Sequence, residues 1–177
     1  MEVVLRWLKR LGIGGGVILA LIYLVFCAYS LPSHTKVRVT GTEVTRKDVQ
    51  DSKGQTHTAD VRYVMAEDLD GNPRMYRNED TGWGWPPYFK FDEGNLAAQA
   101  TNFAVDGRDE VVLLKHYGFR IPMLSAFPNV ISMKTVPEDY AVIPWFKIFF
   151  GLAHVVGLGV IVVFVRDFQK AREEQGR

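Results

Sequence analysis

The chain has 177 residues, 47% of them hydrophobic, and a formal net charge of +1, which indicates about one domain's worth of sequence. A charge balance this close to neutral, without a run of Lys or Arg, argues against nucleic acid as a partner. The hydrophobic residues are concentrated at the two ends of the chain, and the single cysteine cannot form an internal disulfide.

The first apolar stretch, residues 11–31, contains no charged residue. At about 1.5 Å per residue, a helix of this length reaches roughly 30 Å, enough to cross the hydrocarbon core of a bilayer. A cleavable signal peptide is the alternative, since Ala28 and Ser30 are small enough for a cleavage site. Signal peptides, however, usually carry only about 7–15 apolar residues. We therefore expect a retained transmembrane helix that follows a short tail, residues 1–10.

The second apolar stretch, residues 148–165, contains one polar side chain, His154. The residues just before it include a proline, a tryptophan and a lysine, which suit the interface between lipid and water. We expect a second transmembrane helix over residues 144–165, including this interfacial entry, and a final tail over residues 166–177.

The distribution of positive charge predicts the orientation of the two helices. The two tails hold seven Lys and Arg residues, whereas the nearest 15 residues beyond the other end of each helix hold four in total. Cytoplasmic segments next to membrane helices are enriched in Lys and Arg. We therefore expect both tails to be cytoplasmic and the segment between the helices, residues 32–143, to be extracytoplasmic.

Small residues on the two expected membrane helices predict helix-to-helix packing. Five residues of the first helix fall within about 80° of one another on a helical wheel at about 100° per residue: Gly12, Gly16, Ala20, Tyr23 and Cys27. In the second helix Gly157 lies one turn after Ala153, and His154 needs a hydrogen-bond partner inside a bilayer, which predicts that it faces protein. The alternatives are that glycine is simply common in membrane helices and that His154 fills a loosely packed face.

The segment between the helices mostly alternates polar and apolar residues, as half-buried strands do. Six short stretches follow this pattern or form a continuous apolar run: residues 36–39, 60–65, 74–77, 88–91, 111–114 and 130–136. Before the fifth of these stretches, three residues have the spacing of a buried helical stripe: Leu96, Ala100 and Phe103. Asn95 is a favourable N-cap for this helix, and Gly107 is expected to end it.

These elements predict a small α+β domain, in which about six strands form a twisted, open or barrel-like sheet with one packed helix. The polar residues 46–59 predict a loop. A second, short helical turn is expected near residues 124–127, before a proline.

No catalytic motif is present: the chain has no nucleophile elbow, P-loop, HExxH or dinucleotide fingerprint. Its histidines are not paired at metal-ligand spacing, so a zinc site is not expected: His34, His57, His116 and His154. Residues 68–72 (DLDGN) faintly resemble a calcium loop, but they lack its closing Glu and predict a turn. The sequence thus predicts no catalytic residue, no metal and no cofactor.

The least ordinary stretch is NEDTGWGWPPYFKFDEGN, residues 78–95. If this stretch folds back on itself, its carboxylates could meet over the tryptophan faces, an arrangement suited to sugars or cationic groups. The alternative is that the charges solvate the ends of a turn. The candidate partner or ligand surface consists of Trp83, Trp85, Tyr88, Glu79, Asp80 and Asp92.

The two tryptophans of this stretch are expected to have different roles. Residues two apart in an extended segment point to the same side, so both rings need a place in the core, at the membrane interface or against a partner. Because two prolines follow, we expect Trp85 to lie in the core and Trp83 to point outward.

Residues 76–92 (YRNEDTGWGWPPYFKFD) resemble the signature of the bacterial family known as domain of unknown function 1523. Residues 116–120 (HYGFR) and 143–146 (IPWF) look like further segments of that family. The resemblance covers most of the chain and implies a bacterial inner-membrane protein of this architecture, with its central domain in the periplasm. It implies no activity and no catalytic residue, because the family has no assigned function.

The function expected from these features is that of a non-catalytic accessory or assembly subunit of an inner-membrane complex, in contact with membrane lipids and other integral membrane proteins. One alternative is a periplasmic ligand-binding module for an envelope glycan or a cationic solute. Another is an envelope enzyme that uses the carboxylates or His116. A flat apolar patch continuous with the membrane helices favours the subunit, a shallow aromatic cleft the binding module, and a deep pocket with converging carboxylates the enzyme.

Overall fold

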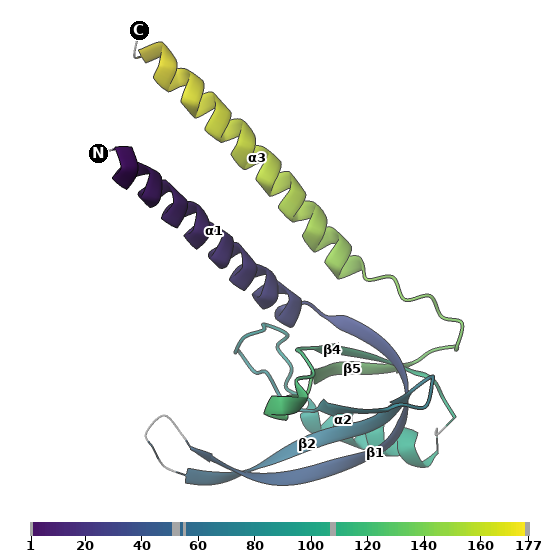
Figure 1. Ribbon diagram of the computed structural model, residues 1–177. Helices are drawn as coiled ribbons and strands as arrows, with labels where there is room; N and C mark the ends of the chain where they lie inside the picture. Colours follow the sequence, from purple (N-terminus) through teal and green to yellow (C-terminus); the bar gives the residue numbers. More distant parts are fainter. Residues whose placement is uncertain (1, 51–53, 55, 107–108, 176–177) are drawn as a thin grey trace. The chain divides into compact units, whose positions relative to one another are not determined.

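The computed structural model describes residues 2–50, 54, 56–106 and 109–175. The chain divides into two compact units, Met1–Ala141 and Val142–Arg177. The elements in chain order have these bounds, and Figure 1 labels all of them except β3 and η1: α1 (Glu2–Ser30), β1 (Ser33–Gln50), β2 (Thr56–Asp68), β3 (Pro73–Arg77), α2 (Glu93–Val105), β4 (Val112–Tyr117), η1 (Pro122–Leu124), β5 (Asn129–Thr135) and α3 (Trp145–Gln175).

The helices α1 and α3 are long and apolar enough to cross a membrane. The candidate spans are Arg10–Ser30 and Trp145–Glu174, and an 18-residue window in each has a mean hydropathy of 2.4 and 2.6, respectively. Only 6% of the first window and none of the second is buried within the described structure. A core helix of a soluble protein would be covered by its own chain. Helix α3 continues past the expected end of the membrane segment, so most of the expected final tail, residues 166–177, is helical.

The strands close into a barrel in the order β1-β2-β3-β5-β4, and β4 pairs again with β1. All neighbouring strands are antiparallel except β3 and β5, which are parallel and meet at one pair, Arg77 with Asn129. Helix α2 connects β3 to β4. This strand order with a helix at that position is the Greek-key arrangement of the OB-fold.

Strand β1 closes the barrel because it bends and pairs with two partners. Its residues 33–37 pair with β4, and from Val37 onward it pairs with β2 (Figure 1). A β-bulge between Val39 and Gly41 bends the strand and changes its direction from one partner to the other. Gly41 suits the bend, since a Cβ there would lie 2.9 Å from the Cε of Met65.

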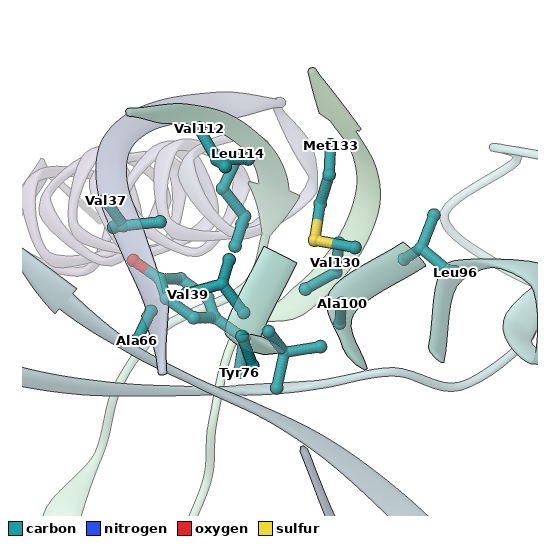
Figure 2. Packing of buried hydrophobic residues seen from close by; sticks show 12 residues of the cluster. Val37, Val39, Ala66, Tyr76, Leu96, Ala100, Val112, Leu114, Val130 and Met133 are labelled. Carbon is teal, nitrogen blue, oxygen red and sulfur yellow. The ribbon is translucent and has the colours of Figure 1, made fainter. Parts of the chain in front are cut away.

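The core fills the barrel interior and is shown in Figure 2. Because successive strand residues point to opposite faces, every second residue of a strand enters the core. Helix α2 adds one stripe of its surface. The cluster consists of Val37, Val39, Val64, Ala66, Tyr76, Leu96, Ala100, Ala104, Val112, Leu114, Val130 and Met133.

The predicted fold class is confirmed: two apolar terminal helices flank a small barrel with one packed helix. The barrel has five strands rather than six, because residues 88–91 are not a strand. Phe89 has a φ of 51°, in the left-handed region, and an extended strand cannot pass through that conformation. The predicted stripe of α2 is confirmed for Leu96 and Ala100, while Phe103 is partly buried.

Three local predictions are wrong. Most of the expected loop 46–59 belongs to the β1–β2 hairpin, whose strands pair as far as Gln50 with Thr56. This hairpin is polar and is held by pairing between its two strands. Its sequence therefore lacks the alternation of apolar residues that predicts a half-buried strand. The N-cap of α2 is Asp92 and not Asn95.

The third is the position of the short helical turn, which was expected near residues 124–127. The turn is η1, which lies slightly earlier in the chain and begins at Pro122. Residues 51–53, 55 and 107–108, including the expected helix end at Gly107, lie outside the described residues.

Candidate functional site

The aromatic loop, defined as residues 78–92, is docked on the last turns of α1. Trp85 stacks on Phe26 with ring centroids 5.2 Å apart, and its Nε1–H donates to Ser30 Oγ at 2.9 Å. The Tyr88 hydroxyl donates to the Ser30 carbonyl oxygen. The last carbonyls of a helix have no partner inside the helix, so the loop satisfies one of them. The contacts fix the end of α1 to the barrel.

The segment that follows β4 contacts the same end of α1. The N–H of Gly118 donates to the Tyr29 carbonyl oxygen at 2.9 Å. The Tyr29 ring makes edge contacts with Tyr117 and Phe119, with centroids 6.0 and 5.6 Å apart. Gly118 has a φ of 93°, and a Cβ there would lie 3.5 Å from both the Tyr29 ring and Pro128. Glycine therefore meets both requirements, the backbone conformation and the close approach.

Lys90 lies inside the aromatic loop, with 4% of its surface exposed. Its Nζ donates to Asn78 Oδ1 at 2.6 Å and to the Glu79 carbonyl oxygen at 3.2 Å. Burial lowers the pKa of Lys90, while four surrounding carboxylates oppose that shift: Asp80, Asp92, Glu93 and Glu79. The lysine ties the two ends of the loop together.

Two buried asparagines complete this network. Asn129 accepts the Glu79 N–H at 2.9 Å and donates Nδ2–H to the Glu79 carbonyl oxygen at 2.9 Å and to the Tyr117 hydroxyl at 3.1 Å. Asn78 donates Nδ2–H to the Glu93 carbonyl oxygen at 2.8 Å. Buried polar groups need such partners, so the loop is an ordered part of the barrel.

The carboxylates predicted to line a ligand surface have structural contacts. Glu79 pairs with Arg77, and Asp80 accepts the N–H of Glu93 at 2.9 Å, at the start of α2. A carboxylate at that position satisfies an unpaired N–H and interacts favourably with the helix dipole. Asp92 is exposed and occupies the N-cap position of α2 without a side-chain hydrogen bond to the helix. The contacts of Glu79 and Asp80 favour the alternative in which the charges support a turn.

An exposed aromatic patch, defined as Trp83, Phe89 and Phe91, lies on the outside of the loop. The Trp83 ring makes edge contacts with Phe89 and Phe91, with centroids 5.4 and 5.8 Å apart. The three side chains are 85%, 53% and 56% exposed. Gly82, just before Trp83, and Phe89 both have positive φ, so the backbone turns at these two positions of the loop. Contiguous exposed apolar groups of this kind often mark an interaction site.

The predicted division between the two tryptophans is half right. Trp83 points outward, as expected, but Trp85 is 61% exposed and does not enter the barrel core. The prediction assumed an extended segment, whereas residues 82–86 form a turn without strand pairing. Trp85 packs instead on Phe26 of α1.

Tyr88 connects the loop to the barrel by stacking on Tyr117, with ring centroids 5.1 Å apart. Burial, with a smaller effect of Tyr117, raises the pKa of Tyr88 to about 12. Burial also raises the pKa of Tyr117. Tyr88 therefore stays protonated at neutral pH and can keep its hydrogen bond to α1.

The residues predicted to pack the membrane helices lie on surfaces that the described structure leaves exposed: Gly12, Gly16, Ala20, Tyr23 and Gly157. Cys27 is half-buried. The Nδ1 of His154 lies 2.8 Å from the carbonyl oxygen of Phe150 in the same helix, and the two rings are in contact. Its hydrogen bonding is thus partly satisfied within α3, which weakens the argument that it must face another protein.

Sequence reasoning missed the residues that hold the loop in place: Ser30, Asn78, Lys90 and Asn129. The alternation of Phe89, Lys90 and Phe91 was the only local signal, and it is misleading, because on a strand it predicts an outward-facing lysine. The structure reverses that arrangement, with the lysine buried and the phenylalanines exposed.

These features define a class of protein: a five-stranded barrel with the strand order of the OB-fold, flanked in sequence by two apolar helices of membrane length. The chain belongs to the family described as Protein of unknown function (DUF1523), whose model matches residues 8–169. The resemblance seen in the aromatic stretch is therefore confirmed.

An uncharacterised protein from Haemophilus influenzae is 39% identical over 116 residues. The match covers 63% of this chain and 66% of the relative, just under two thirds of that protein's length. No solved structure matches the chain.

Proposed function

We propose that the chain is a non-catalytic accessory or assembly subunit of a bacterial inner-membrane complex. In this arrangement α1 and α3 span the membrane, both termini are cytoplasmic and the barrel lies in the periplasm. Its partners are membrane lipids and other integral membrane proteins. The observation that supports this best is the aromatic patch, because it lies on the same loop as Trp85, which packs on Phe26 of α1.

The chemistry of the patch favours a protein partner. Aromatic side chains are enriched among the residues that contribute most to protein interfaces. A sugar site would need polar groups turned toward the rings, yet Glu79 and Asp80 contact Arg77 and the start of α2 instead. A patch on a loop that is docked on the end of an apolar helix suits a partner that itself emerges from the membrane.

The proposed topology predicts where a reporter enzyme will be active. An alkaline phosphatase inserted between Gln50 and Thr56, in the β1–β2 connection, is expected to be active because that enzyme folds with its disulfides only outside the cytoplasm. The same enzyme fused after Arg177 is expected to be inactive. Colony activity and immunoblots for expression provide the measurement, and the reverse pattern would exclude the topology.

The subunit proposal predicts that Trp83→Ala releases the partner without unfolding the barrel. Truncating a central aromatic residue of an interface costs about 2 kcal/mol or more, roughly a thirtyfold loss of affinity. Trp83 is 85% exposed, so the melting temperature of the purified chain should be nearly unchanged. The measurement is purification from membranes in mild detergent, followed by quantitative mass spectrometry of the co-purifying membrane proteins.

Met123→Ala is the matched control, since Met123 is 96% exposed but lies in η1, outside the patch. It is expected to retain the partner at the wild-type level. Equal recovery with Trp83→Ala and Met123→Ala would rule out the patch as the subunit's contact surface.

A further inference from the structure

The barrel is incompletely paired at one seam, between β3 and β5. Strand β3 pairs with β2 over residues 73–77 but with β5 only at Arg77. The edge formed by residues 73–76 therefore has no second strand partner within the described chain. A cavity of about 370 Å³ opens at this edge. Small-molecule sites are typically about 300–1,000 Å³, so the cavity is large enough for a ligand.

The lining of this cavity includes two arginines and a histidine but no carboxylate: Arg74, Arg120 and His116. Arg120 donates Nη1–H to the Ala126 carbonyl oxygen at 3.1 Å and lies 4.0 Å above the Phe127 ring. These contacts fix its guanidinium. Among the described residues, no carboxylate lies within ion-pair distance of Arg120. Because a guanidinium has five N–H donors, several remain for a ligand.

Arg74 and His116 are also held in position. The Nε and Nη2 of Arg74 both donate to Asp68 Oδ2, at 3.3 and 3.0 Å, which neutralises part of the charge and leaves Nη1 for other contacts. His116 Nε2 lies 3.0 Å from Thr35 Oγ1. Of the two arginines, Arg120 is therefore the one whose charge no carboxylate of the described residues offsets.

The cavity lies next to the end of α1. Gly118 and Phe119 contribute to its lining. The same two residues contact Tyr29, through the Gly118 N–H and the Phe119 ring. If α1 crosses the membrane, Tyr29 and Ser30 lie where the helix leaves the hydrocarbon core. The cavity is then at the depth of the lipid headgroups.

We propose that this cavity binds a phosphate-bearing anionic group, and that its source is the headgroup of an anionic phospholipid. Arginine matches phosphate oxygens through paired N–H donors, and a cavity without carboxylates does not repel an anion. The lipid source rests on the proposed membrane anchoring. A soluble phosphate ester has the same chemistry and does not depend on that anchoring.

The test measures lipid retention by the full chain with native mass spectrometry. Protein in detergent is mixed with phosphatidylglycerol or with zwitterionic phosphatidylcholine. The wild type is expected to retain one phosphatidylglycerol in preference to phosphatidylcholine. Arg120→Gln is expected to weaken phosphatidylglycerol binding at least about tenfold, because a charge-assisted hydrogen bond is lost. Arg46→Gln removes the same charge from the β1–β2 hairpin and is expected to have no effect.

Arg74→Gln is a second variant, suitable because the Arg74 side chain is 52% exposed and its removal leaves the core untouched. It is expected to weaken binding in the same direction. Binding of sn-glycerol 3-phosphate together with equal retention of phosphatidylglycerol and phosphatidylcholine would assign the site to a soluble phosphate ester and overturn the lipid source. Equal phosphatidylglycerol retention by wild type, Arg120→Gln and Arg74→Gln would overturn the anion proposal. Trp83→Ala is expected to retain the lipid, so failure of the partner proposal is distinguishable from failure of this one.

Discussion

Replacing Lys90 by methionine is expected to lower the free energy of unfolding of the barrel by about 2–4 kcal/mol. Methionine has a similar length, so it leaves little empty space. It cannot donate to Asn78 Oδ1 or to the Glu79 carbonyl oxygen, and these acceptors lose hydrogen bonds of 2.6 and 3.2 Å. Removing the buried ammonium also removes its desolvation cost, which limits the loss.

The pH dependence of this effect has a defined sign. Burial lowers the pKa of Lys90 below its usual 10.5 in the folded chain. Between the folded pKa and 10.5 the unfolded chain binds more protons, so the wild type gains stability as pH rises through that window. Lys90→Met lacks this gain. The difference in free energy of unfolding between the wild type and Lys90→Met should therefore increase with pH in that window.

The measurement is denaturant unfolding of the full chain in detergent, followed by near-ultraviolet circular dichroism of the barrel aromatics. Lys134→Met is the control, since Lys134 is an exposed residue of β5 and its replacement should change stability by less than about 0.5 kcal/mol. If Lys90→Met and Lys134→Met unfold at the same denaturant concentration, Lys90 does not tie the loop together.

The parts of the fold that were predictable follow from periodic burial. The strands around Val37, Val64 and Val112 alternate because one side of each faces the barrel core. The stripe of α2 repeats about every 3.6 residues for the same reason. The two long helices are recognisable because they lack charge over a membrane-length stretch.

The aromatic loop could not be predicted in the same way, because its burial does not follow a period. Residues 88–91 alternate like a strand, but positive φ at Phe89 reverses the direction of the backbone. As a result Lys90 turns inward to Asn78, 12 positions away in the sequence, and the phenylalanines turn outward. Hydrogen bonds between residues far apart in the chain determine this arrangement. Similarly, nothing in the sequence near Trp85 indicates that its partner is Phe26.

Replacing Asn129 by aspartate is expected to cost about 3–5 kcal/mol at neutral pH, in the range for an uncompensated buried charge. The two side chains have nearly the same shape, so only the chemistry changes. Asn129 Nδ2 donates to the Glu79 carbonyl oxygen at 2.9 Å. A carboxylate oxygen at that position would face another acceptor, although the Tyr117 hydroxyl could still donate to it.

Acid should restore part of this loss, and that response separates the lost hydrogen bond from a general packing defect. Burial beside a carbonyl raises the folded pKa of the new aspartate above its unfolded value of about 3.9. A raised folded pKa contributes stability that is present below the unfolded pKa and disappears as pH rises through the folded pKa. The deficit relative to wild type should therefore be smallest near pH 4 and increase toward neutrality, as measured by denaturant unfolding of the full chain.

Asn95→Asp, at an exposed position in the first turn of α2, should stay within about 0.5 kcal/mol of wild type throughout. A deficit of Asn129→Asp that does not change with pH would mean that Asn129 only fills space between the loop and β5.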